Sequence, residues 1–180
     1  MKSEKIDFIE ILRRWGIGEA NSLDFGYAEN AATVREGLKD KNLYYLIFLL
    51  MKRPILINHL YGLSLDWCLM PFNFIYQNFE NVEVIKTSEW NDITGGTYKL
   101  RDALNFYLNF EGENKVKTII NNLYDMHFDD FSGLIITEEN GSKFRIYEGN
   151  SRLTAIYKYY KENLNLDFLK ETNVIVGFLK

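Results

Sequence analysis

The feature that most constrains the fold is a strand that runs directly into a helix near the end of the chain. Residues 143–148 alternate between apolar and polar side chains, which is the pattern of a half-buried strand. Gly149 follows at once, and residues 151–163 carry apolar side chains at helical spacing. A strand, a glycine turn and an amphipathic helix in succession must pack as two layers, so the sequence predicts a mixed α/β fold.

Periodicity and turn residues predict the remaining elements. Ser3 is the expected cap of the first helix, Gly16 and Gly18 its expected end, and Pro54 the expected stop of the second helix. Asn140-Gly141 is a typical hairpin turn. The expected helices are 3–15, 33–52, two short ones within 55–79, 100–110, 115–123 and 151–163, and the expected strands are 82–85, 134–137, 143–148 and 174–179, with loops or turns at 19–32, 88–92 and 94–97.

The order of these elements divides the chain into two parts. Residues 1–80 are expected to form a helical N-terminal region packed on the core. Residues 81–180 are expected to form an α/β (α+β) domain with a small mixed sheet flanked by helices. The 180 residues are 47% hydrophobic and 16% aromatic, which is enough apolar material for a real core.

Charge, cysteine content and hydropathy exclude several function classes. The net charge of −4 is the wrong sign for a protein that coats nucleic acid, so that partner is not favoured. Cys68 is the only cysteine, so no intramolecular disulfide forms, and a buried thiol is expected. The longest apolar run, 43–51, is shorter than the ~20 residues that span a bilayer. With no signal peptide, we expect a soluble cytoplasmic protein without a membrane partner.

The turn after residue 148 has the features of an anion site. The first N–H groups of a helix have no backbone partner, and the helix dipole adds positive potential there. Gly149 lets a ligand approach the backbone, Asn150 or Ser151 could cap the helix and donate to a phosphate, and Arg152 supplies a planar cation. The alternative is an ordinary strand-to-helix junction in which Asn150 or Ser151 is only a cap and Arg152 is solvated.

The run FRIYEGNSRLTAIYKYY resembles the strand, GxxR turn and helix of the ParB/sulfiredoxin-like superfamily. The matching positions are Glu148, Gly149, Arg152 and Ala155, and the order of elements fits over residues 82–180. This resemblance implies a ParB/sulfiredoxin-like fold in which the turn grips nucleotide phosphates. Members use ATP, ADP or CTP in kinase-like, reductase or switch roles, and others act as nucleases or DNA-modification factors.

Two departures from the family narrow these activities. Sulfiredoxin carries Cys and His directly before the motif Arg, where this chain has Asn150 and Ser151, so sulfinic-acid reduction is not expected. Partitioning ParB proteins carry an Arg-rich segment and a downstream helix-turn-helix DNA reader. In the 180 residues no such reader follows the last family strand, so a partitioning role is not expected either.

A second donor-rich segment follows the first predicted strand of the domain, and the resemblance implies that this region lies beside the nucleotide. Its glycines free backbone N–H groups, its threonines carry hydroxyl donors, and two cations follow. The candidate phosphate-binding residues are Thr94, Gly95, Gly96, Thr97, Lys99 and Arg101. The equally weighted alternative is a plain turn that caps the helix 100–110 through Thr97.

Two carboxylates are candidate catalytic groups. Glu89 follows the first strand, where kinase-like relatives place an acid, and could act as a general base; a solvated surface Glu is the alternative. Glu148 could bind Mg²⁺ or orient the turn, and its alternative is a salt bridge to Arg145 or Arg152. His59 and His127 are isolated, with no second His at metal-ligand spacing. The acidic residues around His127 could bind a metal, but a solvated loop is the favoured alternative, so no metal site is predicted.

These observations favour a nucleotide-binding protein that takes a nucleoside triphosphate or diphosphate, with or without Mg²⁺. A phosphotransferase or an NTPase is the expected enzyme type. The alternatives are a nuclease or DNA-binding module of the same fold, and a non-catalytic protein that self-associates through its aromatic N-terminal half.

Overall fold

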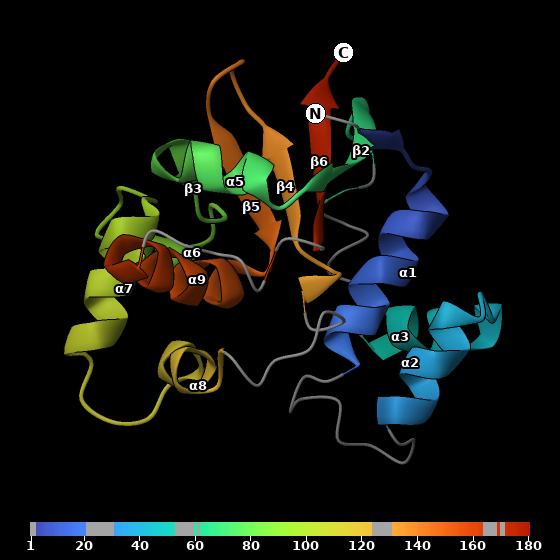
Figure 1. Cartoon of the computed structure of the whole chain (residues 1–180), viewed down its shortest axis with the longest axis horizontal. Helices are drawn as coiled ribbons and strands as arrows, with labels where there is room; N and C mark the ends of the chain where they lie inside the picture. The colour runs from blue at the N-terminus through green and yellow to red at the C-terminus, as the bar shows by residue number, and fades with distance from the viewer. Residues whose placement is uncertain are drawn as a thin grey trace.

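A six-stranded mixed sheet lies at the centre of the computed structural model (Figure 1). The structure describes residues 3–20, 31–52, 60, 62–123, 131–163, 169 and 172–180. Within these ranges the strand order is β1-β2-β6-β4-β5-β3. The strands are β1 Glu4–Lys5, β2 Leu65–Pro71, β3 Val82–Glu83, β4 Ile135–Glu138, β5 Phe144–Glu148 and β6 Asn173–Leu179. The expected α+β class with a mixed sheet is therefore confirmed.

Pairing in the sheet is both parallel and antiparallel. β4 and β5 form the antiparallel hairpin predicted at Asn140-Gly141, and Gly141 has a φ of 72° in the turn. β6 pairs parallel to β4 and antiparallel to β2, so it lies between an early strand and a late one. β3 pairs parallel to β5 at the opposite edge from β1. The parallel pair matters for the site, because both strands end at the same edge.

Helices cover both faces of the sheet (Figure 1). Neighbouring residues on a strand point to opposite faces, so Ile135 and Ile175 join one hydrophobic core, while Ile136 and Val176 join another. The first core packs under α1 Phe8–Glu19, α2 Ala31–Lys39 and α3 Leu43–Lys52. The second packs under α5 Asn73–Asn78, α6 Ser88–Thr94, α7 Leu100–Asn109, α8 Lys115–Asn121 and α9 Asn150–Asn163, with a 3₁₀ turn at Phe79–Asn81.

The N-terminal helices differ from the prediction. The first begins at Phe8, capped by the Asp7 carboxylate, which accepts from the Glu10 amide at 2.8 Å. It continues through Gly16 and Gly18, which were expected to end it. A Cβ on Gly16 would lie 2.6 Å from Leu49 Cδ1, so close packing against α3 explains this glycine.

The predicted helix 33–52 is two helices, α2 and α3, separated at 40–42. Lys41 adopts a φ of 59° there, which no α-helix continues. The pair of short helices expected within 55–79 is also wrong in part: α5 is a helix, but β2 is a strand paired with β6. Residues 1–80 thus contribute two strands to the sheet as well as helices. Pro54 and His59 lie outside the described residues.

The second half of the chain agrees with the prediction within one or two residues at most element ends. One addition is α6, which occupies 88–94 where a polar turn was expected. Thr87 explains this helix, because its hydroxyl caps the Trp90 amide at 3.4 Å. Among the described residues, no helix combines the length and hydrophobicity needed to cross a bilayer.

Candidate functional site

Two helices begin side by side at the edge where β3 and β5 end. α6 follows β3 and α9 follows β5, and the two strands are parallel neighbours. The side-chain oxygen Oδ1 of Asn150 accepts a hydrogen bond from the backbone amide of Ile85 at 2.9 Å. This bond joins the two strand-to-helix junctions. A helix N-terminus carries about half a positive charge, and α9 contributes this potential to the edge, whereas Glu89 in the first turn of the short α6 offsets it there.

Gly149 has the conformation that the turn requires. Its φ is 90°, and a Cβ at this position would lie 2.2 Å from Leu134 Cδ2, so a glycine is needed for both reasons. Its amide donates to Glu148 Oε1 at 2.7 Å, and its carbonyl accepts from the Leu153 amide at 2.8 Å. The Gly149 amide is therefore used within the turn and is not available to a ligand. At the start of α9 the backbone N–H groups of Asn150 and Ser151 could bind one, since the described residues give them no acceptor.

Arg152 is buried rather than solvated, with 8% of its surface exposed. Its Nη2 atom lies 3.4 Å from Glu148 Oε1 and 4.0 Å from Glu19 Oε1, which belongs to the last turn of α1. A Cβ on Gly18 would lie 2.9 Å from Arg152 Nη1, so this glycine makes room for the guanidinium. Of the two arginines that were expected as possible partners of Glu148, Arg152 forms the salt bridge, while Arg145 pairs with Glu83 and Glu139. Arg152 thus ties α9 to α1, and a phosphate would compete with carboxylates for it.

The predicted donors of the second segment are largely used inside the loop. The Gly96 amide donates to the Asn91 carbonyl at 2.9 Å, and the Gly95 amide donates to the Asp92 carbonyl, as in a helix C-cap. The Thr94 hydroxyl is buried and donates to the Trp90 carbonyl at 2.7 Å.

The end of this segment meets the start of α7. The Thr97 hydroxyl lies 2.6 Å from Asp102 Oδ2, so Thr97 contacts the first turn of α7, whose N-cap residue is Lys99. Arg101 is exposed and pairs with Asp102 at 3.4 Å. Lys99 is exposed and bridges to Glu83 of β3 through its backbone. The segment is therefore closer to the plain turn of the alternative than to an open donor loop.

The second segment borders a cavity of about 330 Å³ that the Gly149 turn does not line. The cavity lies between β3, the β4–β5 hairpin and the loop after α6. Its lining residues are Glu83, Lys86, Gly96, Thr97, Tyr98, Glu139, Asn140, Lys143 and Arg145. Arg145 precedes Gly149 by four positions on β5, or roughly 13 Å at a strand rise of ~3.3 Å per residue. Gly96 and Thr97 of the second predicted group line this cavity, whereas the residues of the Gly149 turn do not. The two groups are linked through the segment after β3, where the Val84 amide donates to the Tyr98 carbonyl and the Ile85 amide to Asn150.

An ion network around the buried Arg145 forms one wall of this cavity. Arg145 Nη2 lies 2.9 Å from Glu83 Oε2, Arg145 Nη1 lies 2.7 Å from Glu139 Oε2, and Lys143 Nζ lies 3.3 Å from Glu83 Oε1. Burial alone would raise the pKa of Glu83, but the hydrogen bonds from Arg145 and Lys143 outweigh it and lower that pKa. The network was not predicted from the sequence, because it depends on the pairing of β3 with β5.

Glu89 lies in the first turn of α6 and is exposed. Burial raises the pKa of the Tyr107 phenol, and the charge of Glu89 raises it further, so this carboxylate lies near α7. No described contact joins Glu89 to Glu148, the other predicted catalytic carboxylate. The acidic segment around His127 lies outside the described residues, and no group of metal-ligating side chains occurs within them.

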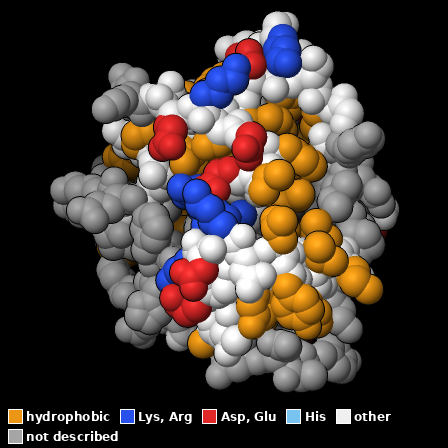
Figure 2. Space-filling model, turned by 90° about the vertical axis from the view of Figure 1, so that its right-hand side faces the viewer, with side chains coloured by type: hydrophobic (Ala, Val, Ile, Leu, Met, Phe, Trp, Pro, Cys, Tyr) orange, Lys and Arg blue, Asp and Glu red, His pale blue; other side chains and the backbone are white. Residues whose placement is uncertain are grey.

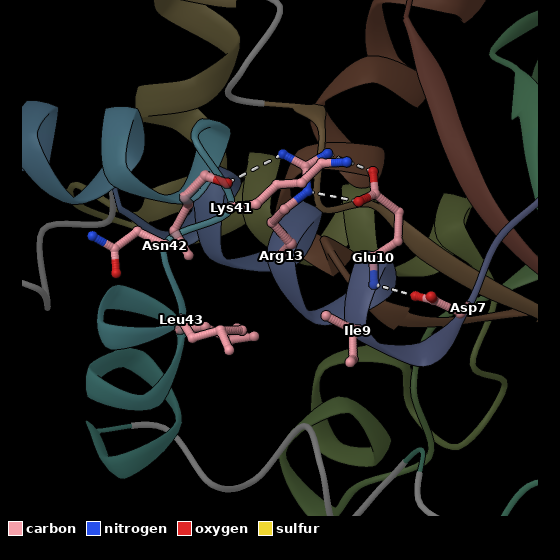
Figure 3. A pocket seen from close by; sticks show the side chains of 9 residues that line it. Asp7, Ile9, Glu10, Arg13, Lys41, Asn42 and Leu43 are labelled. Atoms are coloured by element: carbon pink, nitrogen blue, oxygen red, sulfur yellow. Dashed lines mark hydrogen bonds and ion pairs between the residues drawn. The ribbon is translucent and has the colours of Figure 1, made fainter.

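A smaller cleft of about 160 Å³ lies between α1 and the turn that joins α2 to α3 (Figure 3). Arg13 forms a two-pronged ion pair with Glu10, and its Nη1 atom donates to the Leu38 carbonyl at 3.3 Å. These polar groups satisfy one another, so the cleft offers little for a ligand to bind.

Apolar side chains gather beside this cleft on the face shown in Figure 2. Leu43, Tyr44, Ile47 and Met51 of α3 are exposed by 59%, 60%, 58% and 79%, and Ile9 of α1 by 58%. The sequence predicted one helix over 33–52 and, as an alternative function, a self-association surface in the aromatic N-terminal half, without naming these residues.

Comparison of the chain with protein-family models, curated proteins and solved structures finds no match. The resemblance to the ParB/sulfiredoxin-like superfamily therefore stays a prediction that rests on the residues of the turn and on the order of the elements.

Proposed function

We propose that this protein binds a nucleoside triphosphate or diphosphate by its phosphates, at the edge where α6 and α9 begin. The observation that carries the proposal is the N-terminus of α9 directly after β5, which the bond from the Ile85 amide to Asn150 fixes beside the end of the parallel strand β3. Helix N-termini are common phosphate sites, because their first N–H groups point outward and their dipoles attract anions. The GxxR turn of the ParB/sulfiredoxin-like superfamily supports the same site.

Each residue of the turn has a distinct part in this proposal. The amides of Asn150 and Ser151 and the Ser151 hydroxyl bind phosphate oxygens, while Gly149 holds the turn open to them. Arg152 positions the turn through Glu148 and Glu19, because it is buried between these carboxylates. α9 has no acidic residue in its first turn, and the nearby carboxylates belong to Glu148, which precedes the helix, and to Glu89 of α6.

Phosphotransfer or NTP hydrolysis is the proposed reaction, and Glu148 is the proposed magnesium ligand. Glu148 Oε1 is occupied by the Gly149 amide and Arg152, whereas the described residues give Oε2 no partner. Carboxylate oxygens suit Mg²⁺, which would bridge the protein to the phosphates. Glu89 is the proposed general base, since it is exposed in the first turn of the neighbouring α6.

A thermal-shift screen tests this function. The protein is heated with ATP, ADP, CTP and GTP, each with and without Mg²⁺, and the proposal predicts a rise in melting temperature with at least one of them. The same screen is run on Ser151→Glu, which places a negative charge against the phosphates, and on Asn105→Glu, which adds the same charge on the exposed side of α7. Absence of any shift in the unmodified protein would contradict the proposal.

A second candidate function is protein interaction through α3. Four large apolar side chains of this helix are more than half exposed, and exposed apolar patches of this kind mark interaction sites. The aromatic N-terminal half is thereby proposed as a self-association surface. Multi-angle light scattering tests this, with Ile47→Glu expected to reduce the mass of any oligomer and a monomeric mass at all concentrations counting against it.

A further inference from the structure

The cavity between β3, the β4–β5 hairpin and the loop after α6 has more hydrogen-bond donors than its own acceptors can use. The carboxylates of Glu83 and Glu139 are both neutralised, since each is paired with Arg145 and Glu83 also contacts Lys143. Lys86 is exposed at the cavity, and the described part of the chain gives its ammonium no carboxylate, only the Tyr98 ring at 5.8 Å. Three cations against two carboxylates leave one positive charge.

A buried donor of Arg145 adds to this surplus. The residue is 9% exposed, and its Nη1 and Nη2 atoms are held by the two carboxylates. Its Nε–H is also buried, yet no described residue offers an acceptor within hydrogen-bond distance. Leaving a buried donor without an acceptor is costly, so the two carboxylates do not satisfy the guanidinium of Arg145 completely.

Tyr98 lines the cavity with a strained backbone conformation that several hydrogen bonds hold in place. Its φ of 57° is unusual for a bulky residue and costs energy. Three hydrogen bonds hold it in place: its amide donates to Thr94 Oγ1 at 3.0 Å, its carbonyl accepts from the Val84 amide at 2.8 Å, and its hydroxyl bonds Asn91 Oδ1 at 3.0 Å. Residues held in this region are enriched at active sites and ligand clamps.

We infer that this cavity is a binding site for the phosphoryl group of a small molecule, with Lys86, Lys143 and Arg145 donating to the phosphoryl oxygens. A phosphoryl group is rich in acceptors and carries negative charge, so it matches the donor surplus and the unbalanced cation. Asn140 stands at the rim and contributes an amide to the rest of the molecule. None of these residues belongs to the site proposed at α9, so the two proposals stand separately.

The cavity has room for more than a phosphoryl group. It offers about 330 Å³ of accessible space, whereas one water needs roughly 10–15 Å³ of such space. Room therefore remains beside the phosphoryl group for the rest of an ester, and a sugar phosphate is a suitable probe for that reason.

Isothermal titration calorimetry on the full chain tests the inference with ribose 5-phosphate, inorganic phosphate and ribose as probes. The expected result is binding of ribose 5-phosphate and no binding of ribose. Lys86→Gln with Lys143→Gln is expected to weaken binding about tenfold or more, because each lysine loses a charged hydrogen bond. Lys115→Gln, which removes the same charge from an exposed position on α8, is the matched control and is expected to bind normally.

The two phosphate probes distinguish the sources of the phosphoryl group. Weaker binding of inorganic phosphate supports an ester as ligand, and equal binding supports free phosphate at the same site. Binding of neither probe, or equal binding of ribose 5-phosphate by the double variant, would overturn the inference. Asn140→Asp, which adds a negative charge at the rim of an exposed turn, is a second variant that keeps the test decisive if the lysine variant is unstable.

Discussion

Asn150 binds the backbone amide of Ile85 at 2.9 Å and so holds the start of α9 against the end of β3. The contact spans two strand-to-helix junctions that are far apart in the sequence. Ile85 lies beyond the end of β3, so its amide bonds the side-chain carbonyl of Asn150 instead of a neighbouring strand. The arrangement of the proposed phosphate edge therefore depends on this one side chain.

Replacement of Asn150 is the first test of this contact. Asn150→Ala leaves the partly buried Ile85 amide without its acceptor, and we expect a loss of about 1–3 kcal/mol in the free energy of unfolding. Asn150→Asp keeps an oxygen at the same place and is expected to retain most of the stability. Urea unfolding measures both, and equal losses for the two variants would show that the hydrogen bond is unimportant.

Gly149 offers a second prediction with a close control. Gly149→Ala places a methyl group against Leu134 and forces a φ of 90° on a residue with a Cβ, so we expect a loss of about 2–4 kcal/mol in stability. Gly141→Ala in the hairpin also has positive φ, but nothing lies within 4 Å of its Cβ. It is expected to lose only about 1–2 kcal/mol, the cost of the backbone conformation alone. Similar losses in thermal unfolding would contradict the packing argument.

Arg152 supplies a third prediction about buried charge. Arg152→Ala leaves the buried carboxylate of Glu19 and the half-buried one of Glu148 without this cation, and we expect a loss of about 3–5 kcal/mol. Lys5→Ala removes one partner of an exposed ion pair with Asp66, in which the lysine side chain is 77% exposed, and should cost less than about 1 kcal/mol. Chemical denaturation separates the two, and a small loss for Arg152→Ala would rule out a structural role for this residue.

The ion network of the cavity predicts a dependence of stability on pH. The folded-state pKa of Glu83 lies below its ordinary value of 4.5, so its ionised form stabilises the folded protein above about that pH. This stabilisation is lost as the pH falls through the folded-state pKa. Glu83→Gln should therefore be less stable than the unmodified protein at pH 7, and the difference should shrink below pH ~4.3. Urea unfolding at several pH values checks this, and a difference that stays constant would contradict it.

Sequence periodicity predicted the second half of the fold well, because its strands and helices each bury one face. It failed for β2, since Trp67-Cys68-Leu69-Met70 is an apolar run with residues in both cores and shows no alternation. It also failed at Gly16 and Gly18, which resemble helix stops but make room for neighbouring side chains.

The site could be predicted only in its local parts. The sequence indicated the turn at Gly149 and the helix that follows it, and the structure adds the φ of 90°. The burial of Arg152 depends on Glu19, which tertiary packing alone brings near. The cavity network likewise depends on the pairing of β3 with β5, which places Glu83 opposite Arg145. Contacts between segments distant in the chain carry no local signal.

Direct nucleotide titration tests the central claim, that phosphates bind where α6 and α9 begin. Calorimetry with Mg²⁺ and the nucleotide that shifts the melting temperature most is run on the unmodified protein, Ser151→Glu and Asn105→Glu. We expect measurable binding by the unmodified protein and Asn105→Glu, and at least tenfold weaker binding by Ser151→Glu, because the new carboxylate takes the place of the phosphate at the helix N-terminus. Equal binding by all three proteins would place the nucleotide elsewhere and contradict the claim.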